Sequence, residues 1–203
     1  MKIAIAGASG RAGSCIAAEL ARRGHHVTGI ARNPDKIAKL PNVTAVAGDA
    51  NDRAGLARLW AGHDVAVSSI HFLASDAETL IGAARDSGVP RYLVVGGAGS
   101  LEVAPGVRLV TTPNFPPQYK AEAEKGAAFL DRLGREKELN WTFLSPSALF
   151  DFGSRTGKFR LGGDQLLVDS AGKSWISFED FAVAMADEIE RPAHVRARFT
   201  VGY

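Results

Sequence analysis

The feature that constrains this chain most is a set of three glycines close to its amino terminus. Residues 2–13 are Lys-Ile-Ala-Ile-Ala-Gly-Ala-Ser-Gly-Arg-Ala-Gly, so a short apolar segment passes directly into Gly7, Gly10 and Gly13. Glycine permits a tight turn from strand to helix and lets backbone N–H groups approach an anion without a Cβ between them. The start of the helix adds unpaired N–H groups and a partial positive charge. The pattern predicts a nucleotide-binding turn, rather than a purely structural one, and adds Ser9, Arg11 and Ala12 to the three glycines as contacts.

Apolar strands and amphipathic helices alternate along the first two thirds of the chain. This alternation predicts an α/β fold, a doubly wound, Rossmann-like parallel sheet with helices on both faces. Strands are expected at residues 2–6, 26–31, 43–47, 64–69, 91–95 and 141–144. Helices are expected at about 12–23, after the cap residue Asp52, from the capping box Ser75-Asp76-Ala77-Glu78 to Gly88, and at about 118–133.

The last third differs in character. Residues 158–161 and 165–168, separated by Gly162-Gly163-Asp164, predict a hairpin, and a further strand is expected at 173–176. A helix beginning after Ser177 and a strand at 198–201 complete the chain. Because no linker or repeat interrupts the sequence, residues 1–203 are predicted to form one domain, with about 150–203 as a small α/β appendage on the substrate side. The stretch 100–117, rich in Pro and Gly, is predicted to be a long loop of the kind that often forms a lid.

Ligands of such sheets bind beyond the carboxyl ends of the strands. We therefore expect the segments after the strands to share one rim. From these segments, Ser68, Ser69, Gly97 and Pro146 are predicted cofactor contacts. The wall of a second, acceptor pocket is predicted to come from His71, Phe72, Gly97, Ser100, Ser147, Leu149 and Phe150.

The end of the second strand indicates which dinucleotide is bound. An acidic residue there would hold the ribose 2′-hydroxyl of NAD, but the sequence is Gly-Ile-Ala-Arg-Asn and carries Arg32 instead. A guanidinium suits the 2′-phosphate of NADP, and Arg11 could add to this contact or to the pyrophosphate. NADP is therefore favoured and NAD stays open; the plainer alternative is that Arg32 is a solvated loop charge. Asp49 could accept from the adenine amino group or could form only a turn before the next helix.

Composition excludes several other classes. The net charge is +2 with both signs scattered, whereas a nucleic-acid surface needs clustered Lys and Arg. No apolar run approaches the roughly 18–20 residues that cross a bilayer. The single cysteine, Cys15, excludes an internal disulfide and is expected to pack. We expect a cytoplasmic, soluble monomer or homodimer with no nucleic-acid or membrane partner.

Metal and hydrolase chemistry are not predicted. No His, Cys or carboxylate pairs recur at metal-ligand spacing, and no Gly-x-Ser-x-Gly elbow is present. Four histidines are expected to be solvated at the edges of helices or strands: His25, His26, His63 and His194.

The chain resembles the atypical short-chain dehydrogenase/reductase group, and in particular small bacterial proteins described as candidate NADH–flavin reductases, which are similar to biliverdin/flavin reductases. The segments that carry the resemblance are Gly-Ala-Ser-Gly-Arg-Ala-Gly at 7–13, Tyr-Leu-Val-Val-Gly-Gly-Ala-Gly-Ser at 92–100, Asn-Trp-Thr-Phe-Leu-Ser-Pro at 140–146 and Ser-Trp-Ile-Ser-Phe-Glu-Asp-Phe-Ala at 174–182. The resemblance covers essentially the whole length. It implies a Rossmann-like fold, a nicotinamide cofactor at Gly7–Gly13 and flavin reduction.

One departure from the wider superfamily affects the chemistry. Its dehydrogenases use a Tyr-x-x-x-Lys pair for proton transfer, but four residues after Tyr119 this chain has Ala123. Alcohol–ketone interconversion and sugar epimerisation are therefore disfavoured. Hydride transfer needs mainly that donor and acceptor be held together in a shielded pocket.

The sequence thus favours an NADPH-dependent reductase of a flat conjugated acceptor, with free FMN or FAD, or a quinone, as substrate. The catalytic candidates are His71, Ser100 and Tyr119, although a packing, turn or pocket-lining role is open for each. A non-catalytic dinucleotide sensor and an epimerase/dehydratase-like enzyme remain alternatives. A sensor could fill the acceptor space with bulky side chains such as Phe72, Phe115 or Phe150.

Overall fold

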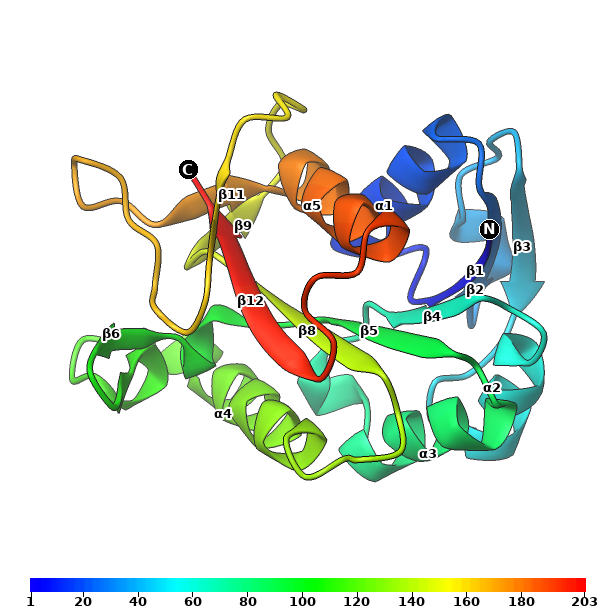
Figure 1. Cartoon of the computed structure of the whole chain (residues 1–203), viewed down its shortest axis with the longest axis horizontal. Coiled ribbons are helices and arrows are strands. Elements are labelled where there is room, and N and C mark those ends of the chain that lie inside the picture. Colours follow the sequence, from blue (N-terminus) through cyan, green and yellow to red (C-terminus); the bar gives the residue numbers. More distant parts are fainter.

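The computed structural model describes residues 1–203 and is built around one eight-stranded sheet (Figure 1). Every neighbouring pair of strands is parallel except β10 and β12. This confirms the predicted α/β fold with a doubly wound parallel sheet. The order across the sheet is β10 (Arg160–Gly162), β12 (Ala197–Gly202), β8 (Trp141–Pro146), β5 (Arg91–Val95), β4 (Val65–Ser68), β1 (Lys2–Ala6), β2 (His26–Ala31) and β3 (Val43–Ala47).

Helices cover both faces of the sheet. On one face lie α1 (Arg11–Arg22) and α5 (Phe178–Glu190), which pack against each other. On the other face lie α2 (Arg53–Trp60), α3 (Ala77–Ser87) and α4 (Pro117–Leu133) (Figure 1). None of these helices combines the length and apolar character that would be needed to cross a lipid bilayer.

The strand alternation divides the interior into two core layers. In β1, Ile3 and Ile5 face α1 and α5, whereas Ala4 and Ala6 face the opposite layer. Successive side chains of a strand point to opposite faces, so a central strand must be apolar throughout. Burying one large aliphatic or aromatic side chain contributes about 1.5–3 kcal/mol, and both layers contain many that are fully buried. The sheet is therefore a rigid base for the loops at its carboxyl edge.

The predicted hairpin of residues 158–168 is wrong. Strand β10 pairs antiparallel with β12 rather than with residues 165–168, which contribute only an isolated bridge between Gln165 and Glu102. The long loop after β5 contains a small antiparallel pair, β6 (Glu102–Ala104) and β7 (Val107–Arg108). The expected strand at 173–176 corresponds to β11 (Trp175–Ser177), which pairs in parallel with β9 (Leu149–Asp151). Strands β9, β10 and β11 find partners distant in the sequence, so local turn residues did not reveal their pairing.

Buried carboxylates of α1 and α5 hold the chain after β9 against these two helices. Asp180 of α5 is fully buried and accepts from the N–H groups of Thr156 and Gly157, both at 2.8 Å, and from the Tyr203 hydroxyl at 2.8 Å. Glu19 of α1 accepts two hydrogen bonds from Arg155, at 2.8 and 2.9 Å. The chain after β9 is thereby fixed alongside α1, next to the glycine turn.

Candidate functional site

The glycine turn between β1 and α1 can be formed only by glycine at two of its positions. Gly7 has φ +85°, and a Cβ built there would lie 2.1 Å from the carbonyl oxygen of Ser69. A Cβ at Gly13 would lie 2.2 Å from the carbonyl oxygen of Gly7. The turn therefore packs directly on the chain after β4 and on the first turn of α1, which brings these three backbones together.

Several N–H groups of this turn have no acceptor in the protein. Gly10 N–H donates to the Gly7 carbonyl at 2.9 Å, and Ser14 N–H donates to the Gly10 carbonyl at 2.9 Å. Between and beside these bonds, four amides are unpaired: those of Ser9, Arg11, Ala12 and Gly13. No acidic side chain lies in the first turn of α1. Converging N–H donors at a helix start form an anion site, so the turn fits a pyrophosphate.

The Arg11 side chain differs from expectation. Its guanidinium forms an ion pair with Asp151 and lies over the ring of Phe178, 4.9 Å from the centroid, and over Phe152 at 5.2 Å. The Phe152 N–H and the Arg11 charge hold the pKa of the Asp151 carboxyl below its usual range. A phosphate contact through this guanidinium would require it to leave Asp151. In this structure Arg11 instead connects the glycine turn to β9.

Arg32 follows β2 and is exposed, with no ion pair and no hydrogen bond to another residue. No carboxylate occupies this position, and the next residue, Asn33, caps the short turn Pro34–Lys36 by accepting from Asp35 N–H at 3.1 Å. The guanidinium is thus available to a phosphate. Asp49 accepts from Asn51 N–H at 2.9 Å, which is the contact of a turn before α2 and supports the structural alternative for this residue.

The ends of β4, β5 and β8 meet the glycine turn, but their side chains are not all accessible. The hydroxyl of Ser68 is buried and bonds the hydroxyl of Tyr92 at 2.8 Å, inside the core. The Ser68 hydroxyl is therefore used inside the core, and the role of Ser68 as a cofactor contact stays a prediction. Ser69 presents its backbone to Gly7, Gly97 is half-buried, and Pro146 ends β8 in a buried position.

Ser100 has an unsatisfied hydroxyl at the rim. It lies in the turn after β5, its residue is 3% exposed, and its Oγ has no hydrogen-bond partner. A buried hydroxyl without a partner costs about 1–3 kcal/mol. Such a group fits a site where a ligand supplies the missing bond.

Tyr119 has no partner for acid–base chemistry in the structure. Its side chain lies in the first turn of α4 and is 62% exposed. Ala123 stands where the superfamily has lysine, and it packs closely on the turn after β5. A Cβ built at Gly99 would lie 2.7 Å from the Cβ of Ala123. The Tyr-x-x-x-Lys arrangement is therefore absent from the geometry as well as from the sequence.

His71 lies in the loop after β4 and is held by a residue that the sequence did not suggest. The Glu122 carboxylate of α4 lies 3.3 Å from His71 Nδ1 and accepts from the N–H groups of Phe72 and Leu73 at 2.7 and 2.9 Å. The imidazole itself is 88% exposed. No spacing rule could have found Glu122, because it lies about fifty positions further along the chain and on a different element.

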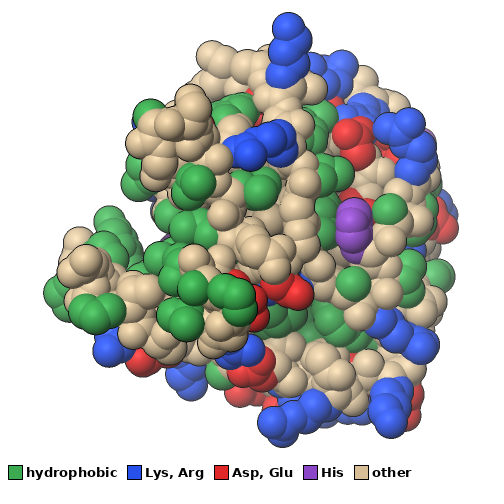
Figure 2. All heavy atoms as spheres, turned by 60° about the vertical axis from the view of Figure 1, so that its left-hand side comes forward, with side chains coloured by type: hydrophobic (Ala, Val, Ile, Leu, Met, Phe, Trp, Pro, Cys, Tyr) green, Lys and Arg blue, Asp and Glu red, His purple; other side chains and the backbone are tan.

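Of the three aromatic residues that could have closed the acceptor space, Phe72 is buried, and Phe115 and Phe150 are half-buried. Phe72 packs between Phe129 and Phe143, and Phe150 packs on Phe178 with 4.3 Å between ring centroids. Several other hydrophobic side chains are exposed in the segments at the rim. Figure 2 views this side and shows hydrophobic side chains around a hollow in the surface, close to a histidine. The exposed residues in these segments are Leu73, Tyr119, Leu149 and Phe152.

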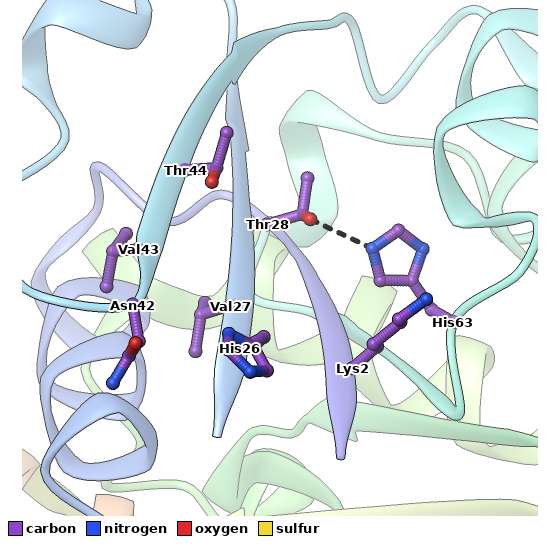
Figure 3. A pocket seen from close by; sticks show the side chains of 8 residues that line it. All are labelled: Lys2, His26, Val27, Thr28, Asn42, Val43, Thr44 and His63. Carbon is purple, nitrogen blue, oxygen red and sulfur yellow. Dashed lines mark hydrogen bonds between the residues drawn. The ribbon is translucent and has the colours of Figure 1, made fainter. Parts of the chain in front are cut away.

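A different pocket, of about 330 Å³, lies at the opposite edge of the sheet (Figure 3). Lys2, His26 and Val43, which begin β1, β2 and β3, line it, and His63 bonds Thr28 there at 2.9 Å. The length of a strand, about 3.3 Å per residue, separates these residues from the glycine turn. This pocket is therefore distinct from the predicted cofactor rim.

The histidines are less solvated than expected. His25 is buried and its Nε2 lies 2.9 Å from Glu190, while Nδ1 of His194 lies 2.8 Å from Glu188. His26 alone of the four is exposed as expected. No group of three or more metal-ligating side chains converges in the structure.

A sequence profile of the NAD(P)H-binding family matches residues 7–192 of this chain. The chain belongs to that family. The match begins at Gly7, the first residue of the glycine turn, and it extends past the end of α5 at Glu190, so it includes helices on both faces of the sheet. The geometry of the turn and the family therefore agree on NAD(P)H as the ligand class.

Three solved structures with the same fold are similar to this NAD(P)H-binding protein over its whole length. One, from Burkholderia pseudomallei and named as a candidate exported protein, is 46% identical with a TM-score of 0.91, and each chain covers 100% of the other. Another, named as a candidate epimerase from Bacteroides thetaiotaomicron, is 38% identical with a TM-score of 0.94 over 100% of this chain and 96% of that one. A third, named as a candidate NADH-flavin reductase from Streptococcus pneumoniae, is 32% identical with a TM-score of 0.87 over 100% and 99%. These three structures share the fold of this chain but carry different descriptions.

Proposed function

We propose that this protein is an NADPH-dependent oxidoreductase that reduces a flat conjugated acceptor, such as free FMN, FAD or a quinone. The observation that carries the proposal is the combination of the unpaired amide turn with Arg32. The turn supplies donors for a pyrophosphate, and the position that holds a carboxylate in NAD enzymes holds an unpaired guanidinium. NADPH is favoured for that reason over NADH.

The residues of the rim fit this cofactor. The amides of Ser9, Arg11, Ala12 and Gly13 would bind the pyrophosphate, and Arg32 would bind the 2′-phosphate. Ser69 and Gly97, together with the Ser100 hydroxyl that lacks a partner, line the path toward the acceptor. When bound, NADPH supplies a hydride.

A conjugated acceptor suits the rest of the rim. Exposed hydrophobic side chains, among them Tyr119, Leu149 and Phe152, offer surface against which a planar ring system can stack. Phe72 is buried against Phe129, and Phe150 is half-buried against Phe181, so both rings are held by other aromatic rings. A flavin or quinone takes its proton from water or from an exposed imidazole, so the absence of the Tyr-x-x-x-Lys pair does not prevent the reaction. The flavin is thus proposed as substrate and not as a resident cofactor.

An epimerase-like reaction receives support from the name of one relative, but the packed Ala123 removes the base that such chemistry would use. A dinucleotide sensor would need the same amide turn but would not need a space for an acceptor. The two possibilities are separated by a single assay, since only an enzyme consumes NADPH.

The experiment is to mix the pure protein with NADPH and, in turn, FMN, FAD and soluble quinones, and to follow absorbance of the reduced nicotinamide. Acceptor-dependent oxidation with saturation in both substrates is expected. Saturable NADPH binding without oxidation by any acceptor would contradict the reductase and support a sensor. Replacing NADPH by NADH is the matched control for the cofactor.

A further inference from the structure

The Glu122 carboxylate makes several polar contacts at the rim that the proposed function leaves unused. Its Oε1 accepts from Phe72 N–H at 2.7 Å and its Oε2 accepts from Leu73 N–H at 2.9 Å. Oε1 also lies 3.3 Å from Nδ1 of His71. One side chain of α4 thus fixes the loop after β4 through two amides and through the histidine.

This arrangement determines which nitrogen of His71 faces outward. A carboxylate only accepts, so the imidazole must place its proton on Nδ1 to bond Glu122. Nε2 is then the atom left for exchange with a ligand or water. Because the side chain is 88% exposed, Nε2 can be reached from the rim.

The position of the loop brings His71 to the proposed acceptor space. Two residues earlier, the carbonyl of Ser69 packs on Gly7 of the amide turn. One residue later, the ring of Phe72 lies below Gly97, 3.7 Å from a Cβ built there. Glu122 itself lies one helical turn after the exposed Tyr119. His71 is therefore located between the turn after β1, the turn after β5 and the start of α4.

We propose that Glu122 is a positioning residue that holds His71 as the proton donor of the reduction, an inference that rests on the proposed function. The acceptor gains a hydride from the reduced nicotinamide and a proton from Nε2 of the imidazolium. His71 is left neutral with its proton on Nδ1, bonded to Glu122, and regains the second proton from water. In sum, NADPH, one proton and the acceptor give NADP⁺ and an acceptor that carries two more hydrogens.

The test compares the wild type with Glu122→Gln and with Glu124→Gln as the matched control. Glu124 lies on the same helix, is exposed and makes no hydrogen bond or ion pair, so the control removes the same charge without the contact. The first measurement is a two-bond ¹H–¹⁵N correlation of the His71 ring at alkaline pH without cofactor. The wild type and the control are expected to show the Nδ1–H tautomer, whereas Glu122→Gln should show a mixture or the Nε2–H form.

The second measurement is steady-state NADPH oxidation with FMN. We expect Glu122→Gln to lower kcat by about tenfold to 100-fold, within the range of proton transfer from a positioned side chain, while KM for NADPH stays within about threefold. An unchanged tautomer or an unchanged kcat in Glu122→Gln overturns the inference. If the variant does not fold, His71→Asn leaves both amide bonds of Glu122 in place, and an unchanged kcat in that variant overturns it equally.

The two measurements separate this inference from the proposed function. If the wild type fails to oxidise NADPH with every flavin and quinone tested, the proposed reductase is wrong. The positioning role of Glu122 in that reaction is then wrong as well. A wild type that is active, with a His71 tautomer indifferent to Glu122, defeats only the positioning role. The ring correlation needs no cofactor and no activity, so it reports on the pairing in either case.

Discussion

Two regions of the molecule use polar groups in opposite ways. At the carboxyl edge of the sheet, the amides of Ser9, Arg11, Ala12 and Gly13, the Arg32 guanidinium and the Ser100 hydroxyl have no partner in the chain. Where α1 and α5 pack together with the chain after β9, the buried carboxylates Asp180 and Glu19 instead accept several hydrogen bonds each. Asp180 has four hydrogen bonds, from Thr156, Gly157 and Tyr203, and Glu19 has five, from Arg22, Arg23 and Arg155.

The difference separates groups that stabilise the fold from groups that are available to a ligand. Buried polar groups without partners are costly, so a folded chain satisfies most of them internally. Where several donors stay unpaired at one edge, binding can supply the missing acceptors. Changes at the unpaired edge should therefore alter affinity, and changes in the paired region should alter stability.

The largest effect is expected from Gly13→Ala. A Cβ at this position would lie 2.2 Å from the Gly7 carbonyl oxygen, so the turn must move and its amides lose their convergence. NADPH affinity measured by fluorescence titration should fall at least about 100-fold, equivalent to about 3 kcal/mol. Gly134→Ala is the control, because its Cβ would meet nothing closer than 3.6 Å. An affinity within about threefold of wild type for Gly13→Ala would contradict the amide site.

The next largest effect is expected from Arg32→Glu. A charged hydrogen bond to phosphate is worth about 1.5–3 kcal/mol, so NADPH affinity should fall about tenfold to 100-fold while NADH affinity changes little. Arg58→Glu, at an exposed position of α2 without an ion pair, should leave both unchanged. Equal losses for the two dinucleotides would remove Arg32 from the 2′-phosphate role.

Glu19→Gln tests the paired region. Hydrogen bonds from Arg155, Arg22 and Arg23 outweigh desolvation and hold the pKa of Glu19 well below its ordinary 4.5. Because two of these arginines are about half exposed, we expect a loss of only about 2 kcal/mol and a Tm lower by roughly 4–8 °C, with NADPH affinity preserved.

The pH dependence of the same variant has a defined sign. A depressed pKa stabilises the fold above the ordinary value, and this stabilisation is lost as pH falls through the folded pKa. The Tm difference between wild type and Glu19→Gln should therefore be largest near neutral pH and shrink below about pH 4.5. A Tm difference that grows on acidification would show that the ion pairs are not its origin.

The smallest effect is expected from Tyr119→Phe. The hydroxyl has no hydrogen-bond partner, and Ala123 stands four residues later in place of lysine, so NADPH oxidation with FMN should stay within about threefold of wild type. A fall of about 100-fold would show that the hydroxyl takes part in proton transfer after all.

Much of the fold follows from local sequence patterns. The alternation of apolar strands and helices predicted the parallel sheet, and the bounds of β1, β2, β3 and β5 agree with expectation. The pairing of β10 with β12 could not be predicted, because the glycines between residues 161 and 165 indicate a hairpin, whereas the sheet edge supplied by β12 offers a longer partner. The pairing partner of β10 was therefore decided by long-range packing, although the local turn residues indicated residues 165–168 as its partner.

The parts of the candidate site that are formed by the backbone could be predicted from the sequence. Gly7 and Gly13 identify the turn because only glycine satisfies its geometry, and Arg32 is identified by its place after β2. Side-chain partners were harder to predict. Ser68 turns inward to Tyr92, Arg11 pairs with a carboxylate 140 positions away, and Glu122 reaches a loop 50 positions before it. Such contacts depend on the packing of distant elements, which single-sequence patterns do not contain.

The most direct test is an amide ¹H–¹⁵N titration of the protein with NADPH. The amides of Ser9, Arg11, Ala12 and Gly13 should shift together and saturate with one dissociation constant, while the amide of Gly62, in a turn at the opposite edge, stays fixed. The absence of any saturable shift in these four amides at millimolar NADPH and NADH would contradict the account.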